Sequence, residues 1–215
     1  MSSARQRPKD PAGNRAAILQ GALEEFALRG YDGATTRAIA ARTGLTHGMI
    51  RYHFKTKEGL WLAAVAHLFA RLNRAVVLSA DELQRLEGGD LDILRDWLKR
   101  YVRYCAEHPE HARIMMQESV APTPRLRRAI RQHVAPAHRQ LKALIESLQA
   151  RRVLPADAPP ESIIYMITGA CQNLFALAPE PKISLGYDAL SDAAVDAHAE
   201  AVVALFVPEV PRPRG

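Results

Sequence analysis

The chain has 215 residues and a formal net charge of +6, and its apolar and charged fractions, 48% and 24%, are ordinary for a globular protein. No apolar run approaches the roughly 20 residues that a membrane-spanning helix needs, and the polar, basic N-terminus does not resemble a secretory signal. We therefore expect a cytoplasmic protein with no membrane partner. The two cysteines, Cys105 and Cys171, have no spacing typical of a zinc site or a disulfide framework, and we expect both to be buried.

The basic excess lies almost entirely in the N-terminal part of the chain. Residues 1–60 contain ten Lys or Arg against five Asp or Glu, whereas the remaining 155 residues contain nineteen against eighteen. A polyanion is therefore expected to bind the N-terminal part.

Residues 1–13, which include Pro8, Pro11 and Gly13, predict a disordered basic arm. Helical periodicity and turn signals then alternate. Gly30 is the expected C-terminal cap of the first helix, Gly44 ends the second, and Thr46 caps the third. The four helices expected in this part of the chain cover residues 15–29, 37–43, 47–54 and 57 to about 78.

The second half of the chain also predicts helices and no convincing strand. A Gly-Gly break lies at residues 87–90, and prolines separate the later segments. The expected helices cover residues 91–107, 109–117, 124–152, 161–178 and 191–207, with a loop at 179–188 and a frayed tail at 208–215. The fold class expected from this pattern is all-α.

Two short helices joined by a glycine-containing turn and packed on a first helix form a DNA-binding helix-turn-helix. Leu45, Ile50 and Phe54 are the expected anchors of this unit, and Ala40 allows a close helix crossing. Gly48 is unfavourable in a helix, which suggests that a DNA backbone or base edge approaches it closely. The residues expected on the exposed side of the recognition helix are Thr46, His47, Gly48, Met49, Arg51, Tyr52 and His53.

These segments resemble the TetR family of bacterial transcriptional regulators over about residues 18–60. The resemblance rests on the run FALRGYDGATT at 26–36, the run IAARTGLT at 39–46 and the run GMIRYHFKTKEGL at 48–60. One departure is Arg51, where many members carry an aromatic residue, so the operator does not follow from better-known members. An arginine can bind guanine with two hydrogen bonds or contact a phosphate.

The resemblance implies specific DNA contacts. Thr36, Tyr52 and Lys57 match positions that usually touch phosphates. Thr46, His47, Gly48 and Arg51 match positions that face base edges or the nearby backbone, and His53 completes the predicted DNA-binding set. Arg5, Arg7 and Lys9 of the arm either enter a minor groove or form a plain disordered tail.

The resemblance also implies domains at 14–60 for DNA binding and at 61–207 for effector binding and dimerisation. The helix at 161–178 is apolar on more than one side, and the last helix carries an apolar stripe. These two helices are the expected four-helix dimer interface, although such patterns also occur in a monomer's core. The predicted interface residues are Ile164, Thr168, Cys171, Phe175, Val195, Ala199, Val202 and Phe206.

A small-molecule pocket is expected in the same domain. Aromatic and methionine side chains suit an apolar or amphipathic effector, although at helical spacing they are also typical of a plain core. The candidate pocket residues are Trp97, Tyr101, Tyr104, Cys105, Met115, Met116, Glu118, His133 and Phe175.

No other chemistry is indicated. No Cys or carboxylate cluster joins His108 and His111, or His133 and His138, at the spacing of a metal site, and no catalytic or phosphate-loop arrangement stands out. We therefore expect no cofactor, no metal and no enzymatic activity. The expected function is a homodimeric repressor that an effector releases from a palindromic DNA operator. The alternatives are an enzyme that uses Glu118 or His133 in the helical domain, and a helical adaptor that has lost DNA binding.

Overall fold

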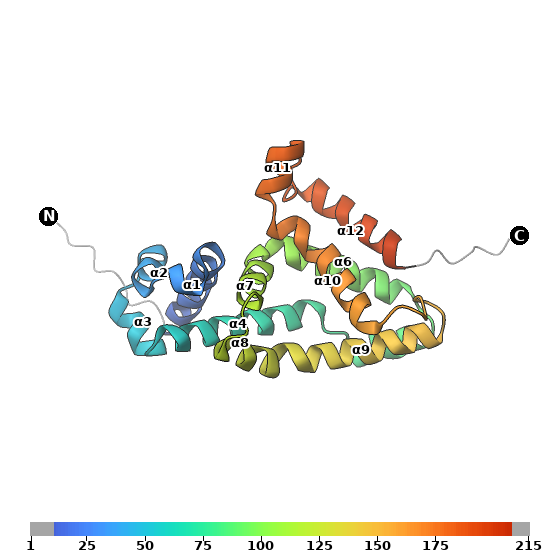
Figure 1. The fold of residues 1–215 in the computed structure, drawn as a ribbon, viewed down its shortest axis with the longest axis horizontal. Helices are drawn as coiled ribbons and strands as arrows, with labels where there is room; N and C mark the ends of the chain where they lie inside the picture. The colour runs from blue at the N-terminus through green and yellow to red at the C-terminus, as the bar shows by residue number, and fades with distance from the viewer. Residues whose placement is uncertain (1–10, 208–215) are drawn as a thin grey trace, which may run out of the picture. The chain divides into compact units, whose positions relative to one another are not determined.

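The computed structural model describes residues 11–207, which are helical throughout apart from turns and short connections (Figure 1). The predicted arm residues Arg5, Arg7 and Lys9 and the predicted tail at 208–215 lie outside the described residues. The helices are α1 (Pro11–Gly33), α2 (Thr36–Thr43), α3 (His47–Phe54), α4 (Lys57–Val76), α5 (Ala80–Glu87), α6 (Asp92–Glu107), α7 (Pro109–Ser119), α8 (Pro124–Ala129), the π-helical segment η1 (Ile130–Val134), α9 (Ala135–Ala150), α10 (Pro160–Ala176), α11 (Pro179–Leu185) and α12 (Asp192–Phe206). The all-α expectation is confirmed.

The chain divides into two compact units. Among the described residues, the first unit comprises residues 11–68 and Arg113–Ala129, and the second comprises Phe69–Ala112 and residues 130–207. The long helix α4 and the helix α7 each contribute residues to both units. Segments that are distant in the sequence therefore share one core in each unit.

The core of the first unit forms where α1 meets the two short helices. Phe26 of α1, Ile39 of α2 and Ile50 of α3 are almost completely buried, as is Trp61 of α4. A Cβ added to Gly21 of α1 would lie 2.4 Å from the side-chain methyl of Thr43 on α2. Glycine at that position therefore permits the close packing of α1 and α2 on which the helix-turn-helix depends.

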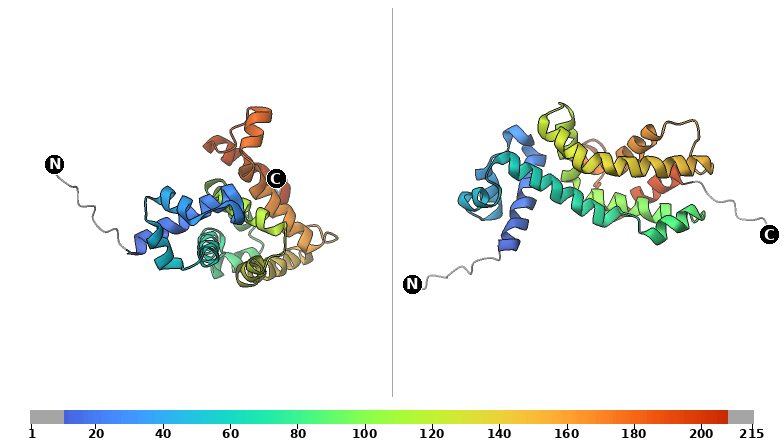
Figure 2. Two further views of the ribbon diagram at one scale, coloured as in Figure 1. Left: turned by 60° about the vertical axis from the view of Figure 1, so that its left-hand side comes forward. Right: turned by 90° about the horizontal axis from the view of Figure 1, so that it is seen from below.

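The second unit is a bundle in which α10 packs against α6, α9 and α12, and α12 also packs against α6 (Figures 1 and 2). Its core is almost entirely aliphatic and aromatic, and both cysteines lie in it as free thiols. Burial raises the pKa of Cys171 to about 12 and raises that of Cys105 as well, so both remain protonated at neutral pH. These cysteines therefore act as small apolar core residues, as expected.

Several elements differ from the sequence-based expectations. The helix α1 begins at Pro11 rather than near residue 15, because proline suits the first turn, where no backbone N–H partner is needed. The helix α5 was not predicted, yet Ser79 and Glu82 form a capping box at its start. The helix expected at 124–152 is interrupted by η1, just before Pro136 in the first turn of α9. Proline there removes a backbone donor and crowds the preceding turn, which opens the helix into a π-helical turn.

The loop expected at 179–188 is also wrong, because residues 179–185 form α11. Pro179 and Pro181 lie in its first turn, where they need no intrahelical N–H bond, and Gly186 ends the helix with a φ of 66°. The prolines that predicted a loop therefore start a short helix.

Among the described residues, no single helix is long and apolar enough to cross a membrane. Two consecutive pairs, α4 with α5 and α10 with α11, reach the required length and composition only when taken together across bends of 53° and 71°.

Candidate nucleic-acid interface

The recognition helix α3 is held by local signals at both of its ends. The Thr46 hydroxyl accepts a hydrogen bond from the Met49 backbone N–H, and the equivalent cap of α2 is the Thr35 hydroxyl, which accepts from Ala38. Gly44 between the two helices has a φ of 66°, the left-handed conformation that glycine adopts without strain. The turn predicted from the sequence is therefore present.

One side of α3 is buried and the other is open. Ile50 and Phe54 face the core of the first unit, whereas Tyr52 is 81% exposed and Arg51 is also exposed. Gly48 has almost no protein neighbour, because an added Cβ would meet only the Thr46 hydroxyl, at 3.8 Å. Nothing inside the protein therefore requires glycine at residue 48.

An open groove of about 420 Å³ lies beside α3. Its lining includes the first residue of each of three helices: Thr36 of α2, His47 of α3 and Lys57 of α4. The free backbone N–H groups at helix starts carry partial positive charge, which favours phosphate. The full lining is Asp32, Ala34, Thr35, Thr36, His47, Ile50, Arg51, Lys55, Thr56 and Lys57.

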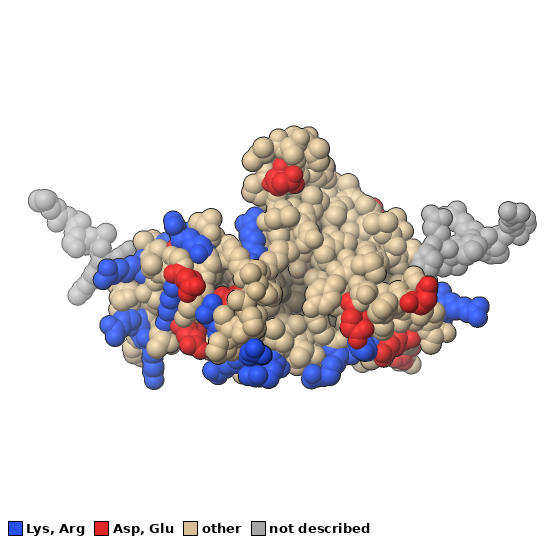
Figure 3. All heavy atoms as spheres, in the orientation of Figure 1, with Lys and Arg blue, Asp and Glu red and all other residues tan. Residues whose placement is uncertain are grey.

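The groove brings together four of the predicted DNA-binding residues: Thr36, His47, Arg51 and Lys57. The others, Thr46, Gly48, Tyr52 and His53, lie on α3 or at its start but do not line it. Figure 3 shows basic side chains projecting around α1–α3, with a few acidic ones among them.

Thr36 and His47 are paired with each other. The Thr36 hydroxyl and the Nε2 atom of His47 lie 3.0 Å apart, within hydrogen-bond distance. This bond joins the start of α2 to the start of α3, so the two residues present one polar surface to the groove.

Lys55 is a charged groove residue that was not in the predicted DNA-binding set. It has a φ of 59° and a ψ of −52°, a sparsely populated combination that costs a non-glycine residue about 1–3 kcal/mol. Its side chain is exposed and adds a third cation to the groove, with Arg51 and Lys57. Sequence position in the turn between α3 and α4 was the available signal, since a basic residue there lies next to Lys57.

Lys57 begins α4 and is held by two contacts. Its ammonium donates a hydrogen bond of 3.2 Å to the backbone carbonyl of Asp32 and lies 4.6 Å from the centre of the Tyr31 ring. The start of α4 is fixed by Thr56, whose hydroxyl accepts from the Gly59 N–H at 2.9 Å. A Cβ on Gly59 would lie 2.6 Å from the Phe54 carbonyl oxygen, so the α3–α4 turn closes tightly there.

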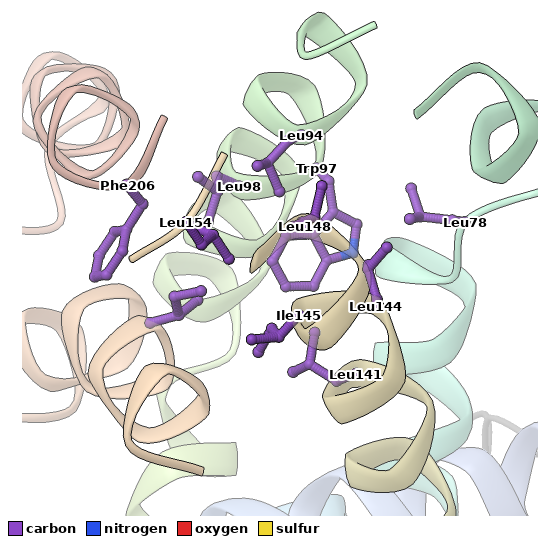
Figure 4. Close-up of a pocket in the computed structure, with 11 residues that line it drawn as sticks. Leu78, Leu94, Trp97, Leu98, Leu141, Leu144, Ile145, Leu148, Leu154 and Phe206 are labelled. Carbon is purple, nitrogen blue, oxygen red and sulfur yellow. The ribbon is translucent and has the colours of Figure 1, made fainter. Parts of the chain in front are cut away.

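The predicted effector residues are distributed over both units. Met115, Met116 and Glu118 belong to the first unit, and the others belong to the second. Only Trp97 lines the small, wholly apolar cavity of the second unit, whose volume is about 20 Å³ (Figure 4). The indole N–H of Trp97 donates to the Val76 carbonyl at 2.7 Å, so the cavity offers no free polar group among its lining residues. The rest of the lining is Leu78, Leu94, Leu98, Leu141, Leu144, Ile145, Leu148, Leu154, Ile167 and Phe206.

Four of the other predicted pocket residues of the second unit are packed in its core, and His133 is half-buried. Tyr101 is buried, and its hydroxyl accepts a hydrogen bond from Gln172 at 2.6 Å. The Tyr104 hydroxyl lies 2.9 Å from Nδ1 of His111, and burial raises the pKa of Tyr104 to about 12. Cys105 and Phe175 are buried, and the His133 ring is stacked on Phe69 at 5.3 Å.

A buried polar cluster surrounds His111. Arg71 forms an ion pair of 2.6 Å with Glu110, and neither side chain is more than 15% exposed. Burial is the largest cause of a His111 pKa lowered to about 3, and the nearby Arg71 acts in the same direction. His111 is therefore neutral at physiological pH. In the described part of the chain, no three His, Cys, Asp or Glu side chains are grouped as a metal ion would require.

Most predicted dimer residues face the core of a single copy. Ile164, Cys171, Phe175, Ala199 and Val202 are buried there, whereas Thr168, Val195 and Phe206 are partly buried. The outward faces of the same two helices carry exposed apolar side chains, including Met166 and Tyr165 of α10 and Leu205 of α12, which is 77% exposed. The adjoining helix α11 exposes Ile183 and Leu185.

Two family descriptions match the chain. Residues 18–64 match "Bacterial regulatory proteins, tetR family", and residues 91–205 match "Tetracyclin repressor-like, C-terminal domain". The first match contains the helix-turn-helix and the groove, and the second covers more than half of the chain.

Individual relatives are also similar. The HTH-type transcriptional repressor AcnR of Corynebacterium glutamicum is 38% identical over 94 residues, which are 44% of this chain and 45% of that protein. In that match the chain thus spans less than half of the relative's length. The HTH-type transcriptional regulator RutR of Escherichia coli K12 is 22% identical over 182 residues, 84% of this chain and 82% of that protein.

Solved structures share the fold. HlyIIR, a hemolysin II transcriptional regulator, has a TM-score of 0.64 at 21% identity, over 93% of this chain and all of that chain. The fatty acid degradation regulator FadR of Bacillus halodurans has a TM-score of 0.59 at 16% identity, over 88% and 97%.

Proposed function

Because this chain belongs to the TetR family of bacterial regulatory proteins, and is thus a DNA-binding transcriptional regulator of a non-enzymatic family, we propose that it represses transcription as an effector-responsive homodimer in the cytoplasm. The observation that carries operator binding is the groove beside α3, where three helix starts and three cations converge. A groove with this charge and this supply of backbone N–H donors suits a DNA phosphate.

The two kinds of DNA contact come from different residues in this proposal. Lys57, Lys55 and the Thr36–His47 pair contact phosphates from within the groove, and such contacts set register and provide much of the affinity. Arg51 reads a base, because it is exposed on the open side of α3 and its planar guanidinium can donate two hydrogen bonds to guanine. The open space at Gly48 allows the DNA backbone to approach α3 closely.

The effector site is proposed in the second unit, at the cavity around Trp97. Its lining is apolar, and the one polar side-chain atom of the lining residues, Nε1 of Trp97, is already bonded to the protein, which favours an effector without a charged group at that end. A volume of about 20 Å³ has room for a single water-sized molecule, so an effector must bind a more open conformation. Binding of that conformation would shift the population away from the DNA-binding state.

Dimerisation is proposed through the outward faces of α10 and α12. Exposed apolar side chains such as Leu205 and Met166 lie there, and two copies paired about a two-fold axis would bury them against each other. A two-fold dimer presents two recognition helices to the two halves of a palindromic operator, with half-sites about one helical turn, or a multiple of it, apart.

The test is a selection of DNA duplexes from a random library, followed by titration of the selected duplex at several salt concentrations. We expect salt-dependent binding that the Tyr52→Ala, Lys57→Ala double variant loses. The matched control is Lys142→Ala, which removes an exposed lysine of the second unit and leaves binding unchanged.

Two other outcomes would point to the alternatives. Selection of no preferred sequence, with the double variant equal to the wild type, would favour an adaptor that does not read DNA. Turnover of a bound compound that is lost in Glu118→Gln or His133→Asn would favour an enzyme. The buried ion pair of Glu118 with Arg125 argues against that enzyme, because it already occupies the carboxylate.

A further inference from the structure

We propose that Arg125 is a positioning residue for operator binding, which holds Lys57 in place through the aromatic ring of Tyr31. The inference rests on the proposed phosphate contact of Lys57. All the residues concerned belong to the first unit, although Arg125 lies at the start of α8, in the segment 113–129 that joins this unit from the later part of the chain.

Tyr31 is the shared contact of two cations. The guanidinium carbon of Arg125 lies 3.7 Å from the centre of the Tyr31 ring, and the Lys57 ammonium lies 4.6 Å from the same centre. Cations are attracted to the electron-rich face of an aromatic ring at these distances. Tyr31 therefore connects the first residue of α4 with the first turn of α8.

The Arg125 side chain is itself rigidly held. Its Nε and Nη2 atoms donate hydrogen bonds of 3.0 and 3.1 Å to the two carboxylate oxygens of Glu118, whose side chain is 5% exposed. Paired bonds of this kind fix the orientation of a guanidinium plane. The plane that lies over Tyr31 is thus anchored in the interior of the unit and does not move freely in solvent.

The ring is also held by its aromatic neighbours. Tyr31 is stacked on Phe26 of α1, with 6.0 Å between centroids, and meets Trp61 edge-on at 6.5 Å. Trp61 lies one turn after Lys57 on α4, so the same cluster sets the rotation of α4 at its first turn. Gln117 of α7 adds a hydrogen bond of 3.0 Å to the Ala27 carbonyl of α1, which ties the segment 113–129 to the same part of α1.

This arrangement has a consequence for Lys57. A lysine side chain in free solvent samples many rotamers, and ordering it against a phosphate costs affinity. Because the Tyr31 ring and the Asp32 carbonyl already restrict Lys57, its ammonium is preorganised for the phosphate contact before DNA binds. Loss of the Arg125 contact frees the ring and, with it, the lysine.

The experiment is a double-mutant cycle measured on the selected operator duplex with the full chain. Lys57→Met is introduced into the wild type and into an Arg125→Met, Glu118→Gln background, which removes both buried charges together and leaves no lone carboxylate. A second background, Arg125→Lys, keeps a charge beside Glu118 but lacks the planar stack, and serves if the first fails to fold. Tyr52→Phe, which removes a proposed phosphate contact on α3, is the control in each background.

In the wild type, Lys57→Met should weaken binding about tenfold and reduce the salt slope by about 1. In either Arg125 background its effect should fall below about threefold, with little change in slope, while the Tyr52→Phe effect stays the same. An unchanged Lys57→Met effect would overturn the proposal, as would a parallel loss of both effects, which indicates general damage to the unit. A wild type that binds no selected duplex would overturn the proposed function itself, and the positioning role with it.

Discussion

Replacing Gly48 with alanine should strengthen the fold and weaken operator binding. Gly48 is the second residue of α3 and has an ordinary φ, so alanine can adopt its conformation. The added methyl would meet only the Thr46 hydroxyl at 3.8 Å, which is an ordinary van der Waals contact. Within the protein, the substitution should therefore stabilise the fold without causing a steric clash.

The size of each effect follows from this geometry. A Gly→Ala change at a compatible position stabilises a protein by about 0.4–1 kcal/mol, chiefly because the unfolded chain loses conformational freedom. For a chain of this length, that raises the melting midpoint by roughly 1–4 °C. If a DNA backbone occupies the open space, the methyl should weaken binding by about tenfold or more, equivalent to about 1.4 kcal/mol.

Thermal unfolding by circular dichroism and operator titration by fluorescence anisotropy measure the two effects. Gly44→Ala is the matched control, because its φ of 66° makes alanine unfavourable by about 1–2 kcal/mol although nothing lies within 4 Å of the added Cβ. We expect a lower melting midpoint for Gly44→Ala and a higher one for Gly48→Ala. A Gly48→Ala variant with unchanged operator affinity would refute the close approach of DNA at α3.

Three further predictions follow from other residues. Lys55→Gly should relieve a φ of 59° and raise stability by about 1 kcal/mol, yet lower the salt slope of operator binding by about 1; an unchanged slope would place Lys55 outside the interface. Leu205→Glu, at a position 77% exposed, should give monomers in sedimentation equilibrium and weaken operator binding, whereas an intact dimer would exclude the outward face of α12. His111 has a folded pKa of about 3 against an ordinary 6.5, so the unfolded chain binds the extra proton and stability falls as the pH drops from 6.5 towards 3, by up to about 1.4 kcal/mol per pH unit. His111→Asn should make denaturation midpoints less pH-dependent in that window, and an unchanged dependence would contradict this role.

The N-terminal helices were predictable because local signals determine them. Thr46 caps α3 through its own side chain, and Gly44 supplies a positive φ at the turn, so neither depends on distant residues. The family resemblance then located the phosphate-contact candidates, and the groove brings Thr36 and Lys57 together. The helices and the candidate site residues could thus be located from the sequence in the part of the chain where local signals determine the structure.

The second half of the chain was harder to predict because proline interrupts a helix at one position there and begins a helix at another. At residue 136 a proline interrupts a helical pattern and accompanies a π-helical turn, whereas at residues 179 and 181 prolines begin a helix. The difference depends on whether the preceding turn is already helical, which periodicity alone does not reveal. The capping box of Ser79 and Glu82 was the available signal for α5.

Tertiary contacts account for the site residues that the sequence could not assign. Glu118 was a candidate pocket residue, but in the folded chain its carboxylate is paired with Arg125. The contact between Arg125 and Tyr31 joins segments that are distant in the sequence, and no local pattern connects them. The same holds for the Trp97 cavity, which is lined by residues from four helices and two connections (Figure 4).

Gly48 and Lys55 depart from local preference in opposite ways, and both lie beside the proposed DNA-binding surface. A glycine occupies a helix where alanine would fit, and a lysine occupies a positive φ where glycine would fit. Each change towards the locally preferred residue should stabilise the free protein, so intramolecular packing does not account for either. The proposed DNA contact would account for both, because Gly48 would leave space for a DNA backbone and Lys55 would supply a charge for a phosphate. If Gly48→Ala and Lys55→Gly both stabilised the fold without weakening DNA binding, DNA contact would explain neither residue.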